Sequence, residues 1–150
     1  DGGTVVLVEG VSGMGKTTFV QSFLASLEAT TVLEGRCFER ESVPYKGFDG
    51  VVEALSRVLL ELREAEQERI LADAGPLLLL FPVLSRVPSV AAQAIEAEAF
   101  DGQKARRRAF RALRSALERL AERGPLVVFL DDMQWCDQDS VALLRELVAR

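Results

Sequence analysis

Histidine is absent from the 150-residue chain, and cysteine, tryptophan and tyrosine are scarce. Without histidine, no imidazole can act as a general base or as a metal ligand. The two cysteines, Cys37 and Cys136, lie far apart and form no C-x-x-C motif, which together with the absence of histidine excludes a zinc site. Both follow the ends of predicted strands and approach each other if those ends meet. We interpret them as buried free thiols in a cytoplasmic protein.

Long apolar runs and an excess of positive charge are also missing. The most apolar stretch, residues 76–84, is interrupted by Pro82 and is too short to span a bilayer. The first residues lack the basic region, apolar core and cleavage site of a signal peptide. The net charge of −5 argues against general affinity for nucleic acid. We therefore expect a single domain over residues 1–150, with neither membrane nor nucleic acid as a partner.

The chain does contain a complete G-x-x-x-x-G-K-[ST] motif at residues 10–17. The motif follows the apolar run of residues 5–8 and precedes residues 17–28, whose apolar side chains recur at helical spacing. A buried strand that leads through a glycine-rich turn into a helix is the context in which this motif binds phosphate. The alternative is a glycine-rich surface turn. We predict that the chain binds a nucleoside triphosphate.

The residue types of this loop suit phosphate chemistry. Glycines allow positive φ and a close approach of backbone N–H groups to an anion. Lys16 supplies a cation for the β- and γ-phosphates, and the Thr17 hydroxyl can ligate Mg²⁺. Thr18 either reaches the α-phosphate or caps the helix. The predicted nucleotide-binding residues are Gly10, Ser12, Gly13, Met14, Gly15, Lys16, Thr17 and Thr18.

A second candidate anchor for the nucleotide is the pair Asp131 and Asp132, which directly follows the apolar run of residues 126–130. Ligands of parallel sheets bind beyond the carboxyl ends of the strands, so we expect Asp131 at the same edge as the loop. We predict that Asp131 orients or ligates Mg²⁺ and that Asp132 polarises the attacking water, because no histidine is available. Gln134 either orients water or bonds the start of the next helix. The alternative for the whole segment is a plain strand-end turn.

Predicted strands and helices alternate along the chain. The patterns predict strands at residues 4–9, 30–37 and 126–130, and helices at 17–28, 48–66, 101–122 and 137–150. Residues 67–100, which contain three prolines, are expected to form short helices joined by turns. This alternation predicts an α/β fold of the P-loop NTPase class, with a parallel sheet flanked by helices.

The segment Asp131–Ser140 closely resembles the D-D-x-Q-W-x-D-x-x-S signature of the AAA-like ATPase module in bacterial STAND proteins, the signal-transduction ATPases with numerous domains. Residues 35–37 and 106–110 also resemble that module, and the resemblance covers nearly the whole chain. It implies an ATPase of the ASCE/AAA-like type that uses Mg²⁺ and has the sheet order 5-1-4-3-2. It also implies that residues 1–150 are the N-terminal part of one module, truncated before the sensor-1 strand.

The same resemblance implies a cytoplasmic signalling switch within a larger protein. Its partners would be other domains of the same chain, namely a kinase- or cyclase-type input and tetratricopeptide-like repeats, and it would form a nucleotide-dependent homo-oligomer. Three other functions stay open on the residues alone. A GTPase would use the same loop, but D-x-x-G is not met after residue 130 and N-K-x-D is absent. A small-molecule kinase could use residues 67–100 as a lid, and a nucleotide-holding scaffold would have little turnover.

Several polar residues have a plainer interpretation. The basic run Lys104–Arg114 is best explained as a solvated or intramolecular helix face, with protein docking or nucleic-acid binding as alternatives. Arg36 and its acidic neighbours fit a solvated loop better than a γ-phosphate sensor. Trp135 suits a core anchor that also lies near the site. Asp137 or Asp139 is expected to cap the last helix.

Overall fold

The computed structural model describes residues 3–39, 43–93 and 102–149. Within these ranges, β1 (Thr31–Arg36) and β2 (Leu126–Asp131) pair in parallel. The helices are α1 (Lys16–Ala25), α2 (Lys46–Leu60), α3 (Glu64–Ile70), α4 (Pro88–Ala91), α5 (Gly102–Ala121) and α6 (Gln138–Val148), with 3₁₀ helices η1 (Gly75–Leu79), η2 (Pro82–Arg86) and η4 (Met133–Trp135).

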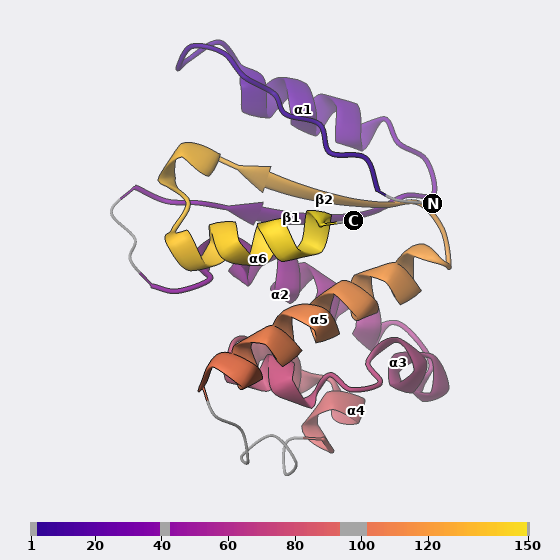
Figure 1. The fold of residues 1–150 in the computed structure, drawn as a ribbon. Coiled ribbons are helices and arrows are strands. Elements are labelled where there is room, and N and C mark those ends of the chain that lie inside the picture. Colours follow the sequence, from indigo (N-terminus) through magenta and orange to yellow (C-terminus); the bar gives the residue numbers. More distant parts are fainter. Residues whose placement is uncertain (1–2, 40–42, 94–101, 150) are drawn as a thin grey trace.

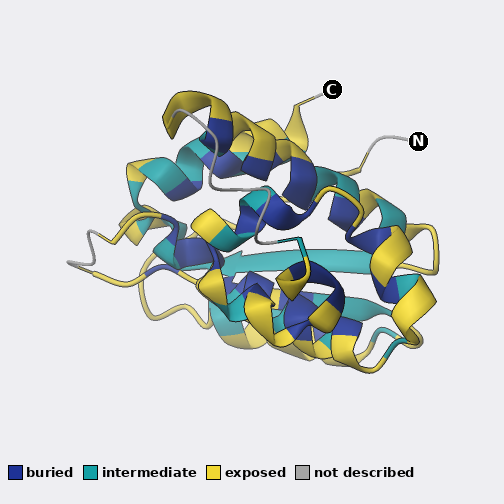
Figure 2. Ribbon diagram, turned by 90° about the horizontal axis from the view of Figure 1, so that it is seen from below, coloured by how far each residue is buried: buried dark blue, intermediate teal, exposed yellow. Residues whose placement is uncertain are grey.

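The sheet lies between two unequal helical layers. Figure 1 shows α1 above the strands and α2, α5 and α6 below them. The core fills the lower layer, because α2 and α5 each present a continuous apolar stripe at helical spacing. Figure 2 shows dark blue, buried residues along these helices, while β2 is intermediate throughout. Fully buried members of the core include Leu33, Phe48, Val51, Leu55, Leu59, Phe81, Leu84 and Leu113.

Helix α2 packs unusually close to β1, and glycines make this approach possible. A Cβ atom on Gly50 would lie 2.7 Å from the carbonyl oxygen of Glu34. A Cβ atom on Gly35 would lie 2.8 Å from Cγ2 of Val51. Since real side chains do not tolerate such distances, the residue type at both positions is dictated by the packing of the helix on the strand.

Residues 64–93 form the far side of the helical layer, where α3 and η1 pack against α5, η2 packs against α2, and α4 packs against α3, η1 and η2. This confirms the prediction of short helices joined by turns for the described part, while residues 94–100 lie outside the described ranges. The predicted single helix at 48–66 is wrong, because α2 ends at Leu60 and α3 begins at Glu64. The turn between them redirects the chain so that Ile70 and Leu71 become fully buried.

The strand predicted at residues 4–9 is not present. These residues have no regular secondary structure, and Val5, Val6 and Leu7 are each at least 70% exposed. Among the described residues the sheet consists of β1 and β2, and residues 4–9 pair with neither of the two outer edges that this pair leaves open. The apolar pattern of residues 4–9 therefore predicted a strand propensity that is not realised in the described structure.

The other predicted elements are confirmed. β1 and β2 occupy the predicted strand segments, and α1, α5 and α6 occupy the predicted helices within a few residues at each end. The parallel pair with helices on both sides fits an α/β fold, whereas the strand order 5-1-4-3-2 stays a prediction. Among the described residues, no helix combines the length and the apolar character that crossing a bilayer requires.

Candidate nucleotide-binding site

The loop of residues 10–17 turns sharply before it enters α1. Gly13 and Gly15 both have φ of 81°, the left-handed conformation that glycine adopts without a steric penalty. The N–H of Met14 donates to the carbonyl oxygen of Val11 at 3.3 Å, and Gly15 is the N-cap of α1. Gly10 does not have a positive φ, and a Cβ atom there would make only ordinary contacts with the Lys16 and Met14 side chains.

Lys16 folds its side chain back over the loop. Its ammonium group donates to the carbonyl oxygens of Gly10 and Val11, at 2.8 and 3.0 Å. The cation is therefore held inside the curve of the loop and faces the space that the backbone encloses. Two carbonyl oxygens are weaker partners than a phosphate anion, so this arrangement keeps the charge available for a polyphosphate.

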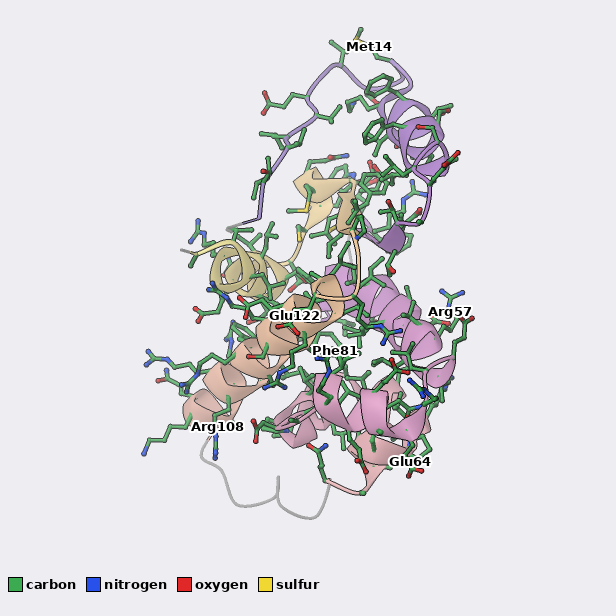
Figure 3. All side chains as sticks on the ribbon, turned by 90° about the vertical axis from the view of Figure 1, so that its right-hand side faces the viewer. Met14, Arg57, Glu64, Phe81, Arg108 and Glu122 are labelled. Carbon is green, nitrogen blue, oxygen red and sulfur yellow. The ribbon has the colours of Figure 1, made fainter. Side chains whose placement is uncertain are left out.

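The remaining loop residues are exposed at the tip of the molecule. Ser12, Gly13 and Met14 are all accessible, and Figure 3 places Met14 at the end farthest from Glu64 and Phe81. Thr18 is exposed on α1, whose N-terminus has no side-chain cap, so the capping role considered for Thr18 is absent.

Thr17 and Asp131 bring the two predicted anchors together. The Thr17 hydroxyl lies 3.0 Å from both oxygens of the Asp131 carboxylate, although 114 positions separate the residues. Oδ1 of Asp131 also accepts the backbone N–H of Asp132 at 2.9 Å. The first turn of α1 and the carboxyl end of β2 are thereby joined at one point, as the strand-end rule predicts.

A hydroxyl and a carboxylate are donors that Mg²⁺ prefers, since it binds hard oxygen ligands. Among the described residues, no group of three or more histidine, cysteine, aspartate or glutamate side chains could hold a metal by itself. Thr17 and Asp131 therefore suit an ion that arrives with phosphate and retains water and phosphate oxygens as its other ligands. The donor set fits the predicted cofactor.

Asp132 is held by two side chains, neither of which was predicted to do so. Arg36 makes an ion pair with Oδ2 of Asp132 at 2.8 Å, and the Gln134 amide donates to Oδ1 at 3.0 Å. Asp132 itself has φ of 55°, a left-handed conformation that aspartate tolerates better than most residues. The Arg36 side chain is 59% exposed, so the prediction of a solvated residue is confirmed, but Arg36 is the last residue of β1 and not part of the loop.

The position of Arg36 follows from the register of the strands. Arg36 is the last residue of β1 and lies opposite Asp131, so its side chain reaches the next carboxylate along. The guanidinium group also lies 5.7 Å from the centre of the Phe38 ring. The ion pair could have been predicted from the sequence only with the register of the two strands. If both strands end together, residue 36 lies beside residues 131 and 132.

An open groove of about 300 Å³ adjoins this cluster. It lies between α1, the two strands and the start of α2, and both charged side chains and the apolar side chains of Phe38 and Phe129 line it. Its lining residues include Thr17, Gln21, Arg36, Phe38, Asp49 and Asp131. A polar ligand held by the loop would therefore meet Arg36 and Asp131 along one wall.

The segment after β2 connects the cluster to the helical layer. Trp135 is 45% exposed, so the core-anchor interpretation is wrong. The backbone N–H of Trp135 donates to the carbonyl oxygen of Asp132. Asp137 caps α6, as its carboxylate accepts hydrogen bonds from the N–H and the hydroxyl of Ser140 and from the N–H of Tyr45. Of the two predicted caps, Asp137 is the correct one.

The basic run on α5 is partly intramolecular. Arg106 pairs with Asp139 at 2.7 Å and lies over the rings of Tyr45 and Phe110. Arg114 pairs with Glu118 and donates to two backbone carbonyls near the end of α6. These contacts agree with the intramolecular face that we favoured, and they give no support to nucleic-acid binding.

Comparison with known proteins identifies the family. The family model described as the AAA ATPase domain matches residues 1–150, the entire chain. No curated protein and no solved structure matches the chain significantly. The matched family has nucleotide binding and hydrolysis as its general activity, and it agrees with the phosphate loop and the acidic strand end found here. The chain therefore belongs to the AAA ATPase domain family.

Proposed function

We propose that this chain is the Mg-ATP-binding and hydrolysing switch of a multidomain bacterial signalling protein. The observation that carries the proposal is the contact of Thr17 with Asp131, because it unites the phosphate loop with the acidic strand end. In this arrangement, the backbone of residues 10–15 and Lys16 hold the β- and γ-phosphates. Thr17 and Asp131 hold Mg²⁺, which offsets phosphate charge when it is bound.

Asp132 is the group that activates water. Arg36 and Gln134 each occupy one of its oxygens, and a carboxylate has about four acceptor positions, so a water molecule can still donate to it. The water oxygen attacks the γ-phosphorus, the bond to the β-γ bridging oxygen breaks, and ADP leaves with that electron pair. Asp132 accepts the proton of the water, and Arg36 positions the carboxylate through its ion pair.

The alternative of a small-molecule kinase depended on residues 67–100 as a lid over the nucleotide. The described part of residues 67–100 packs against α2 and α5, on the opposite side of the sheet from α1. Phe81 and Leu84 of this region are buried in the core. The described residues 67–93 do not extend over residues 10–17, and they pack within the helical layer. A GTPase and a scaffold with little turnover remain the alternatives that an experiment must separate.

Trp135 provides the test, because it is the single tryptophan and hydrogen-bonds to Asp132 through its backbone. We would titrate the intact protein with Mg-ATP and with Mg-GTP while following tryptophan fluorescence, and then measure phosphate release with the preferred nucleotide. Saturable binding of ATP with phosphate release is the expected result. A preference for GTP contradicts the ATPase assignment, and binding without release indicates the scaffold. Calorimetry in parallel reports binding that fluorescence does not detect.

A further inference from the structure

Two cysteine side chains that the proposed function does not use lie against the same point of the fold. Cys37 follows β1, is 2% exposed, and donates its backbone N–H to the carbonyl oxygen of Asp131 at 3.0 Å. Cys136 follows η4, and its N–H donates to the carbonyl oxygen of Met133. A methyl group on Gly47 would lie 2.8 Å from Sγ of Cys37 and 3.4 Å from Sγ of Cys136.

The two sulphurs are close neighbours, because both lie within 3.4 Å of the same point beside Gly47. Both are free cysteines, and the described residues hold no cluster in which they would serve as metal ligands. Gly47 leaves room for both sulphurs at the start of α2, where any larger residue would collide with Cys37. The pair is thus a packed dithiol without an assigned role.

The two thiols differ in accessibility. Cys37 is only 2% exposed, so its side chain is shielded from reagents in solution. Cys136 is only partly buried and is therefore the group that an oxidant in solution reaches first.

We propose that Cys37 and Cys136 form a reversible oxidation site, which closes to an intramolecular disulfide in the presence of a low-molecular-weight disulfide such as oxidised glutathione. The Cys136 thiolate attacks one glutathione sulphur, and a mixed disulfide forms as the first glutathione leaves as a thiolate. Cys37 then gives its proton to that thiolate and attacks the Cys136 sulphur, which releases the second glutathione. Two protein thiols are oxidised, and one glutathione disulfide is reduced to two glutathione thiols.

The bond would connect the two segments that follow the strands. Arg36 immediately precedes Cys37, and Asp132 lies four positions before Cys136, so the cross-link restrains the residues on either side of the ion pair. It also closes a chain segment of roughly 100 residues, which raises the melting temperature by about 5–15 °C on the chain-entropy estimate. This proposal rests on the thiol geometry and is independent of nucleotide hydrolysis.

The test compares the intact folded protein in oxidised glutathione with the same protein in dithiothreitol. After free thiols are alkylated, trypsin releases peptides 37–40 and 124–145, each with one of the two cysteines. The expected result is a single covalently linked pair of these peptides in the oxidised sample, together with the higher melting temperature and quenched Trp135 fluorescence. Dithiothreitol is expected to reverse all three signals.

Cys37→Ser and Cys136→Ser are the matched variants, and neither should give the linked peptides or the rise in melting temperature. Circular dichroism establishes that each variant is folded, and if Cys37→Ser is not, the partly exposed Cys136→Ser decides alone. Three results overturn the proposal. These are a persistent glutathione adduct on Cys136, a cross-link between two molecules, or a linked pair that forms only in denaturant.

Discussion

The Thr17 hydroxyl and the Asp131 carboxylate meet at 3.0 Å and connect the first turn of α1 to the end of β2. Helix α1 buries only Leu24, so its position over the sheet depends little on apolar packing. A polar contact at a point where ligand chemistry is expected therefore also fixes the place of the phosphate loop. Changes at either residue should affect binding more than they affect the core.

Asp131→Asn should reduce the affinity for Mg-ATP by about 10–100-fold, because the amide keeps the shape of the side chain but lacks the charge that attracts the cation. Calorimetric titrations with magnesium and with EDTA provide the measurement. The variant should lose the part of the affinity that depends on magnesium. Asp73→Asn, at an exposed turn in the helical layer, is the matched control and should bind as the parent does. An unchanged magnesium dependence in Asp131→Asn would place the metal elsewhere.

Lys16→Ala should weaken nucleotide binding by roughly 10- to 100-fold, since a charged hydrogen-bond donor to phosphate is removed. The Lys16 ammonium now bonds only to loop carbonyls, and these can be solvated by water once it is gone. Lys104→Ala removes an equal charge from the exposed start of α5 and serves as the control. If both variants bind ATP equally well, the loop of residues 10–17 is not the phosphate site.

Asp132→Asn should leave ATP affinity nearly unchanged while slowing hydrolysis by about 10²–10⁴-fold, the usual contribution of a general base. Asparagine tolerates the left-handed backbone at this position, so the fold is preserved. Phosphate release under single-turnover conditions separates the chemical step from binding and product release. Hydrolysis at the parental rate would mean that another group activates the water.

The sequence was sufficient for features that depend on local order. The loop of residues 10–17 is specified by its own glycines, lysine and threonine, and Asp131 is placed by a general property of parallel strands. The periodicity of α5 likewise predicted which of its sides would be buried. In each case the information lies within a short stretch of chain or in one topological rule.

The features that were missed depend on partners distant in the sequence. Residues 4–9 have the composition of a buried strand, but a strand exists only where a neighbour completes its hydrogen bonds. The ion pair of Arg36 with Asp132 requires the register of β1 against β2, which apolar patterns do not specify. The exposure of Arg36 was predicted correctly, but its partner was not, because the apolar patterns do not show which carboxylate lies beside the end of β1.

Asp137→Ala should destabilise the protein by about 1–2 kcal/mol at neutral pH, because α6 loses its N-cap. Burial acts to raise the pKa of Asp137, but hydrogen bonds from Ser140, Tyr45 and Gly47 outweigh it and hold the pKa below its ordinary value. The folded state therefore favours the charged carboxylate, and its contribution is present above about pH 4, the unfolded pKa. That contribution is lost as the pH falls through the lower pKa of the folded state.

Denaturant unfolding of wild type and Asp137→Ala between pH 7 and pH 3 measures this difference. The difference in the free energy of unfolding between wild type and Asp137→Ala should become smaller towards pH 3. Asp137→Asn retains an acceptor for the cap without a titrating group, so its stability relative to Asp137→Ala should not vary with pH. A gap between wild type and Asp137→Ala that is constant over the range would show that the carboxylate charge contributes nothing.

Gly35→Ala should destabilise the protein by about 1–3 kcal/mol, the usual cost of forcing an extra methyl group into a packed interior. The new methyl group would collide with the backbone of Gly47 and with the Val51 side chain, and β1 cannot move away while it is paired with β2.

Gly102→Ala is the matched control, because a Cβ atom there meets nothing within 4 Å at the start of α5. Since alanine favours a helix more than glycine does, Gly102→Ala should be neutral or slightly stabilising. Denaturant midpoints, compared at a constant m-value, give the change in the free energy of unfolding for each of the two variants. Equal stability of the two variants would mean that α2 can move away from β1 at little cost, and the close packing of these two elements would then not explain the glycine at position 35.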